Sequence, residues 1–176
     1  MSRAEGSSPS ITAGDVAAAQ KEWSDRLIAI GKTFSDGGDY KAVAQATLDA
    51  LYGYASGFDV LFKPTKAADK AIRLTEAEAA SYFVGDGCCA EDKGFALAPY
   101  TAVKWDNKGT IFHGDSATAM GEYTFTDAGG GETKAEYTFQ YARAADGSLK
   151  IVVHHSSLPF VKTLPLDPEN ETTYRP

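Results

Sequence analysis

The spacing of apolar residues changes once along this chain, near residue 94, from intervals of three and four to intervals of two. Intervals of three and four place apolar side chains on one side of a helix, whereas an interval of two places them on one face of a strand. The chain is therefore predicted to form helices first and a run of antiparallel strands afterwards. This order indicates an α+β fold, with N-terminal helices packed on one face of a mostly antiparallel sheet.

Two helices are predicted in the first third of the chain. The first begins after Thr12, whose side chain can cap it, and Gly37-Gly38 ends it. Asp39 opens the second helix. The first helix carries an apolar stripe that consists of Val16, Ala19, Trp23, Leu27, Ile30 and Phe34. A long helix with one such stripe is expected to bury that side against the sheet.

A short strand and a third helix are predicted next. The segment from Phe58 to Thr65 is apolar and aromatic, which favours a strand, and Pro64 must end that strand or lie at an edge. Thr75-Glu76-Ala77-Glu78 has the spacing of a capping box, so the third helix begins there. It ends near Gly85-Asp86-Gly87.

The second half of the chain is predicted to form the main sheet. Strands are expected near 94–105, 109–115, 117–126, 133–143 and 149–156. A strongly curved sheet around the long helix forms a cone, and alternate residues of several strands line its open mouth. Residues 13–160 are read as one domain, between a disordered N-terminal segment (1–12) and an extended C-terminal tail or linker (161–176).

Charge and hydropathy exclude some classes of protein. The 176 residues suit one domain, and the formal net charge is −7 with no run of lysine or arginine, which argues against a nucleic-acid partner. No stretch reaches the roughly 18 apolar residues of a membrane-spanning helix, so no membrane partner is expected. The adjacent Cys88 and Cys89 cannot join distant segments and are interpreted as two reduced thiols in a loop, with a redox switch as the alternative.

Histidine placement argues against a metal site. The chain has three histidines, and His154 and His155 are neighbours on a predicted strand, where successive side chains point to opposite faces. They therefore cannot both bind one metal ion, and no HxH, HExxH or CxxC spacing is present, so neither a metal nor another cofactor is predicted. One face of this strand carries Ile151, Val153, His155 and Ser157, and the other carries Val152, His154, Ser156 and Leu158.

One His/Ser pair is thus expected to line the mouth of the cone, although both histidines could instead be hydrogen-bonded strand residues. Hydroxyl groups offer further polar candidates. Thr65 follows a hydrophobic strand and either caps the next segment or presents its hydroxyl at the pocket rim. Tyr82 is either a core residue or a phenol directed into the cone. The strand tyrosines, among them Tyr123, are mostly expected to pack in the core.

Five segments of the chain together resemble the iota class of carbonic anhydrases. They are Leu61-Phe62-Lys63-Pro64-Thr65-Lys66-Ala67, Tyr82-Phe83-Val84-Gly85, Lys93-Gly94-Phe95-Ala96, Ala119-Met120-Gly121-Glu122-Tyr123-Thr124-Phe125 and His154-His155-Ser156-Ser157-Leu158-Pro159. The resemblance runs in order from about residue 13 to residue 160. It implies a nuclear-transport-factor-2-like (NTF2-like) cone, close to the association domain of calmodulin-dependent kinase, and reversible hydration of carbon dioxide without a metal.

The resemblance also implies which residues bind bicarbonate and act on carbon dioxide. These are Thr65, Tyr82, His155 and Ser157, with Tyr123 as a further substrate-binding residue, and the alternative facing of the last strand would replace the pair by His154 and Ser156. The hydroxyls would hold water beside carbon dioxide, and His155 would take the proton. A homodimer is expected, in the plastid stroma of an alga or the cytoplasm or periplasm of a bacterium.

Two other functions remain open at this point. The same fold can serve as an oligomerisation or association domain with a non-catalytic pocket. It can also support isomerase or hydrolase chemistry on a larger apolar substrate, which would need an aspartate base inside the cone. Asp59 is the candidate for that base.

Overall fold

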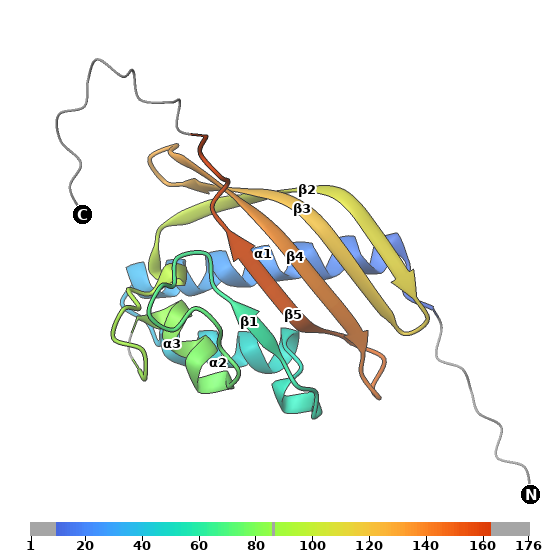
Figure 1. Ribbon diagram of the computed structural model, residues 1–176. Helices are drawn as coiled ribbons and strands as arrows, with labels where there is room; N and C mark the ends of the chain where they lie inside the picture. Colours follow the sequence, from blue (N-terminus) through green and yellow to red (C-terminus); the bar gives the residue numbers. More distant parts are fainter. Residues whose placement is uncertain (1–9, 86, 163–176) are drawn as a thin grey trace, which may run out of the picture.

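A helical layer covers one face of a five-stranded sheet in the computed structural model, which describes residues 10–85 and 87–162 (Figure 1). The helices are α1 (Ala13–Ser35), α2 (Tyr40–Leu51) and α3 (Glu76–Val84), with short 3₁₀ turns η1 (Tyr54–Ser56) and η2 (Phe95–Leu97). The strands are β1 (Leu61–Lys63), β2 (Tyr100–His113), β3 (Ser116–Asp127), β4 (Glu132–Arg143) and β5 (Leu149–Ser157). None of the helices that these residues form is long and apolar enough to cross a bilayer.

The sheet is mixed and open. Its strand order is β1-β5-β4-β3-β2, with β1 parallel to β5 and every other pair antiparallel. β1 is an edge strand that ends at Lys63, as the proline after it requires. The α+β class is confirmed, but the strong curvature expected of a cone is not, because the sheet stays open between its β1 and β2 edges.

The first and third helices begin where the capping residues predict. The Thr12 hydroxyl accepts a hydrogen bond from the Asp15 backbone amide, and the Asp15 carboxylate accepts one from the Thr12 amide. Thr75 and Glu78 form the same reciprocal box at the start of α3. Each box satisfies backbone donors that the first helical turn leaves free.

Two of the predicted strands form one continuous strand. The polar segment 106–108, which separates the strands predicted near 94–105 and 109–115, lies inside β2 at a register shift between Asn107 and Gly109. The Asn107 amide is held there by the Gln20 side chain, and its carbonyl oxygen accepts a hydrogen bond from the Tyr137 hydroxyl. The predicted break between two strands is absent because a glycine inside a strand can mark a β-bulge as well as a turn.

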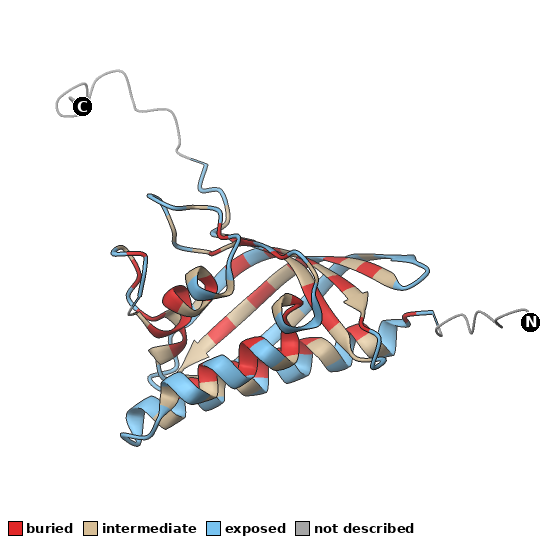
Figure 2. Ribbon diagram, turned by 90° about the horizontal axis from the view of Figure 1, so that it is seen from below, coloured by how far each residue is buried: buried red, intermediate tan, exposed pale blue. Residues whose placement is uncertain are grey.

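The core lies between α1 and the inner face of the sheet, where the buried parts of both face each other (Figure 2). Trp23 is its centre, with its ring within 6.2 Å of the Trp105 and Phe125 rings on β2 and β3. Most of the predicted apolar stripe is buried, namely Val16, Trp23, Leu27 and Ile30, whereas Ala19 is half-buried and Phe34 is exposed. Ile11, in the expected N-terminal segment, is buried too. Residues 1–9 and 163–176 of the expected end segments lie outside the described part.

Candidate active site

The two histidines of β5 point to opposite faces of the sheet, as strand alternation predicts. His154 and Ser156 are buried against the helical layer, whereas His155 is exposed and Ser157 half-buried on the outer face. The prediction that His155 and Ser157 enter the interior is therefore wrong by one residue. The inward pair is His154 and Ser156.

A β-bulge explains the error. On β4, Gln140 pairs with Val153 and Tyr141 pairs with Ile151, so Val152 has no partner residue on that strand. One extra residue shifts the alternation by one position. Ile151 and His154 are consequently both buried although three positions separate them.

Three hydroxyl groups meet beside His154 in the interior. Ser156 Oγ lies 2.6 Å from Thr65 Oγ1 and accepts a hydrogen bond of 2.6 Å from the Tyr123 hydroxyl. Tyr123 Oη also lies 3.5 Å from His154 Nε2. The structure thus joins Thr65 and Tyr123, both predicted site residues, to the inward pair of β5.

Strand pairing brings Thr65 to this place. β1 runs parallel to β5 with Lys63 opposite His155, so the chain that leaves β1 passes beside Ser156. The Lys63 ammonium adds a hydrogen bond of 3.0 Å to the Ser156 carbonyl oxygen. Thr65 is therefore part of the polar cluster.

Tyr82 approaches the cluster from the last turn of α3. Its side chain is buried, and its hydroxyl has no hydrogen-bond partner among the described residues. Burial raises the pKa of Tyr82 to about 12. The nearby Thr65 hydroxyl and Lys66 backbone act in the opposite direction and lower this pKa. A buried phenol without a partner is available to a ligand, because leaving such a group unpaired costs free energy.

A small cleft of about 230 Å³ reaches Tyr82 from the surface. It is lined by Lys66, Tyr82, Glu91, Asp92, Lys93, Gly94, Phe95, Ala98 and Tyr100. The Tyr82 ring stacks on Phe95, with ring centroids 5.3 Å apart, so the wall of the cleft is largely aromatic there.

The cluster is electrically neutral at physiological pH. Phe139 and Phe62 pack on the His154 ring at centroid distances of 4.1 and 4.7 Å. Desolvation, and then the nearby His155, lower the pKa of His154 well below its ordinary value of 6.5. Burial raises the pKa of Tyr123. The site therefore offers neutral O–H and N–H groups in an apolar setting, which suits binding of a small oxyanion.

Sequence reasoning missed two residues behind His154. The Tyr52 hydroxyl lies 2.8 Å from His154 Nδ1, and the Trp23 indole nitrogen donates a 3.1 Å hydrogen bond to that hydroxyl. Tyr52 follows α2 and forms a β-bridge with Ile151, which brings its ring close to β5. Trp23 belongs to the predicted apolar stripe of the first helix, and no local signal indicates that either residue reaches His154.

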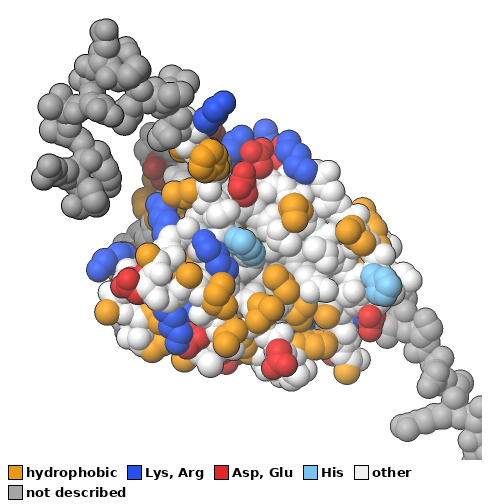
Figure 3. Space-filling model, in the orientation of Figure 1, with side chains coloured by type: hydrophobic (Ala, Val, Ile, Leu, Met, Phe, Trp, Pro, Cys, Tyr) orange, Lys and Arg blue, Asp and Glu red, His pale blue; other side chains and the backbone are white. Residues whose placement is uncertain are grey.

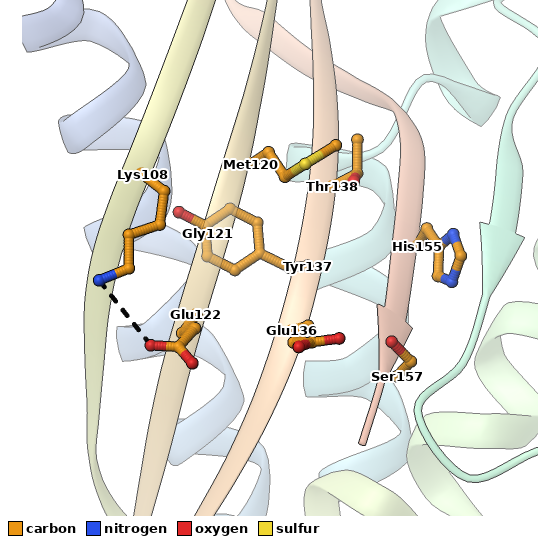
Figure 4. A pocket seen from close by; sticks show the side chains of 9 residues that line it. All are labelled: Lys108, Met120, Gly121, Glu122, Glu136, Tyr137, Thr138, His155 and Ser157. Carbon is orange, nitrogen blue, oxygen red and sulfur yellow. Dashed lines mark ion pairs between the residues drawn. The ribbon is translucent and has the colours of Figure 1, made fainter. Parts of the chain in front are cut away.

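The pair that was predicted to line the interior lies beside a separate hollow on the opposite face of the sheet. His155 and Ser157 lie on the outer face of the sheet, beside a hollow of about 500 Å³ (Figure 4). Its other lining residues are Lys108, Met120, Gly121, Glu122, Glu136, Tyr137 and Thr138. His155 thus lies across the sheet from Thr65 and Tyr82 and cannot act with them on one small molecule.

The remaining candidates do not join the cluster. Asp59, the possible base for other chemistry, is exposed. Cys88 is exposed and Cys89 buried, with their sulfurs 3.6 Å apart and no disulfide between them. Within residues 10–85 and 87–162, no three His, Cys, Asp or Glu side chains are grouped in a way that could hold a metal ion.

Comparison with known proteins gives a consistent result over nearly the whole domain. A family model described as "Metal-independent carbonic anhydrase" matches residues 14–158. A protein of that description from Nostoc sp. is 43% identical over 154 residues, which cover 85% of this chain and 75% of the relative. The crystal structure of a cyanobacterial iota-carbonic anhydrase complexed with bicarbonate is 41% identical, with a TM-score of 0.84 over 87% of this chain and 95% of that one.

More distant structures share the fold. A putative calcium/calmodulin-dependent protein kinase II association domain from Xanthomonas campestris has a TM-score of 0.54 at 23% identity, covering 89% of this chain and 91% of that one. A putative dehydratase of the NTF2-like family from Streptomyces avermitilis has a TM-score of 0.54 at 14% identity, covering 84% and 96%. At these identities the similarity concerns the fold alone, which is NTF2-like.

Proposed function

Because this chain belongs to the family of metal-independent carbonic anhydrases, we propose that it catalyses the reversible hydration of carbon dioxide to bicarbonate in the interior cluster. The observation that carries the proposal is the convergence of the Thr65, Tyr123 and Ser156 hydroxyls beside the unpaired hydroxyl of Tyr82. The related cyanobacterial enzyme was crystallised with bicarbonate, which is a small oxyanion of the kind such donors bind.

The proposed mechanism depends on orientation and on neutral donors. Carbon dioxide is apolar and enters along the aromatic wall beside Tyr82. The Thr65 and Tyr82 hydroxyls position a water molecule next to its carbon, which lowers the barrier by proximity. As the new C–O bond forms, negative charge grows on the carbon dioxide oxygens. The Ser156 hydroxyl, which accepts a hydrogen bond from Tyr123, donates its own proton to one of these oxygens and stabilises the charge.

The proton released in this step goes to solvent water through the cleft. His154 is a poor acceptor because burial lowers its pKa well below 6.5, and burial raises the pKa of Tyr82 and Tyr123, so these phenols stay protonated. His155, the acceptor expected from the sequence, lies on the other face of the sheet. We therefore assign the site to Thr65, Tyr82, Tyr123, His154 and Ser156.

The two alternative functions have less support. The association-domain structures are similar in fold only, whereas the carbonic anhydrase relatives share more than 40% of their residues with this chain. Chemistry with an Asp59 base would need that residue inside the domain, and it is exposed.

A homodimer is also proposed, through the outer face of the sheet. Apolar side chains that are more than half exposed lie on this side of the sheet or along its edge strands, including Met120 on β3 and Ile111 on β2. Figure 3 shows this face, where hydrophobic and charged side chains are interspersed. Covering it with a second copy would remove apolar surface from water.

Paired substitutions on β5 test the catalytic assignment. Ser156→Ala removes an interior hydroxyl, whereas Ser157→Ala removes the neighbouring hydroxyl on the outer face. Loss of one hydrogen bond to the transition state, about 1.5–3 kcal/mol, should slow carbon dioxide hydration about 10- to 100-fold in Ser156→Ala only. Stopped-flow hydration assays would measure both variants, and the parent with and without a strong chelator.

The parent should keep its rate in chelator. Loss of activity that zinc restores would contradict the metal-independent mechanism. A Ser156→Ala protein with the parent rate, or a Ser157→Ala protein that is inactive while folded, would show that the reaction takes place elsewhere.

A further inference from the structure

A buried line of hydrogen bonds lies behind the imidazole of His154. It starts at the indole N–H of Trp23 on α1, passes through the Tyr52 hydroxyl, and reaches His154 Nδ1, with lengths of 3.1 and 2.8 Å. All three side chains are buried, and Tyr52 is 0% exposed. Solvent therefore cannot supply other partners to these atoms.

The donor and acceptor groups that are present determine which atom donates in each of these two hydrogen bonds. An indole nitrogen can only donate, so the Tyr52 oxygen is the acceptor in its contact with Trp23. The remaining hydrogen-bond partner of that hydroxyl among the described residues is His154 Nδ1. If Nδ1 carried the proton instead, the Tyr52 hydroxyl proton would be buried without an acceptor, which folded proteins avoid.

We propose that Trp23 and Tyr52 are positioning residues that hold His154 with its proton on Nε2, so that His154 serves the reaction as a hydrogen-bond donor rather than as a base. The proposal rests on the proposed function for its catalytic part. The tautomer itself follows from the contacts of Tyr52 alone.

The tautomer of His154 determines the direction of the hydrogen bonds in the rest of the cluster. Nε2–H faces the Tyr123 oxygen at 3.5 Å, which leaves the Tyr123 proton for Ser156 Oγ and the Ser156 proton for Thr65 or for a bound oxygen. With the proton on Nδ1, the bare Nε2 would attract the Tyr123 proton away from Ser156. Donors directed at the reacting oxygens are what a growing negative charge requires.

The charge state of His154 agrees with this role. Burial lowers the pKa of His154 well below 6.5, so the ring is neutral at neutral pH and exists as one of two tautomers. A neighbour that favours one tautomer therefore determines whether Nε2, the ring nitrogen that faces the cluster, donates or accepts a hydrogen bond.

Nitrogen NMR of protein labelled with ¹⁵N-histidine tests the proposal at pH 7.5, because protonated and unprotonated ring nitrogens have different shifts. The spectrum of His154→Gln identifies the His154 signals. In the parent, Nε2 should carry the proton and Nδ1 should not. In Tyr52→Phe, molecules with the proton on Nδ1 should appear, and kcat/KM for hydration should fall about tenfold.

Tyr54→Phe is the matched control. The Tyr54 ring stacks on Tyr52 at 6.1 Å, but its buried hydroxyl has no hydrogen-bond partner within the described residues. This variant should keep both the parent tautomer and the parent rate.

A proton on Nδ1 in the parent would overturn the proposal, and this measurement decides the matter even if Tyr52→Phe fails to fold. A folded Tyr52→Phe protein with an unchanged tautomer and rate would overturn it too. Absence of hydration by the parent would instead overturn the proposed function, while the spectrum would still determine the tautomer.

Discussion

The buried imidazole of His154 makes the stability of this protein depend on pH. Desolvation lowers the pKa of His154 in the folded state well below 6.5, whereas the unfolded chain exposes the ring and restores its ordinary pKa of about 6.5. Below pH 6.5 the unfolded chain therefore binds a proton that the folded protein does not. The loss of stability therefore begins near pH 6.5 and grows as the pH falls toward the lowered pKa of His154 in the folded protein.

The size of the effect follows from proton binding by the unfolded chain. At pH 6.5 half of the unfolded molecules carry the proton, which lowers the free energy of unfolding by about 0.4 kcal/mol. At pH 5.5 the loss relative to pH 7.5 is about 1.4 kcal/mol, provided that the folded ring stays neutral.

Urea unfolding at pH 7.5, 6.5 and 5.5 measures this loss, and two substitutions isolate it. His154→Gln removes the buried titrating ring. Between pH 7.5 and pH 5.5, the free energy of unfolding should therefore fall by about 1.4 kcal/mol less in His154→Gln than in the parent. His155→Gln leaves the buried ring in place, so the loss of stability that desolvation of His154 causes should persist in this variant. Equal pH dependence in the parent and His154→Gln would refute the reasoning, because the buried ring would then titrate as it does in the unfolded chain.

Two further outcomes are expected from the structure. Asp92→Asn removes the carboxylate whose two oxygens each accept a 2.9 Å hydrogen bond from the buried Arg73, while the Glu91 carboxylate remains 3.3 Å from that guanidinium. The variant should lose about 1.5–3 kcal/mol of stability in urea unfolding, and a loss below about 0.5 kcal/mol would contradict this. Light scattering at micromolar concentration should give a mass of at least two chains, and Met120→Glu, at an exposed position on the outer face, should lower it; a monomeric parent would count against the proposed dimer.

Much of the fold could be predicted from local patterns. The helix starts at Thr12 and Thr75 were predicted because a capping box lies within four consecutive residues. The opposite facing of His154 and His155 follows from strand geometry alone. The continuity of β2 could not be predicted, because Asn107 is held inside the strand by Gln20, 87 residues earlier in the chain.

The candidate site was predicted in part. Thr65, Tyr82 and Tyr123 were named and converge, although only pairing of β1 with β5 brings Thr65 to Ser156. His155 and Ser157 were chosen for the wrong face. No local pattern marks Val152 as a bulge, since that depends on how β5 pairs with β4.

The sequence by itself determined the order of helices and strands, the helix caps, and the residue types of a neutral hydroxyl and imidazole site. Each of these depends on residues that are close together in the chain, where side-chain period and hydrogen-bonding groups act directly. The tertiary structure alone decided which His/Ser pair faces inward, that Tyr52 and Trp23 stand behind His154, and that β2 is continuous. These features depend on strand register and on contacts between distant segments, which are set when the whole core packs and not by any local pattern.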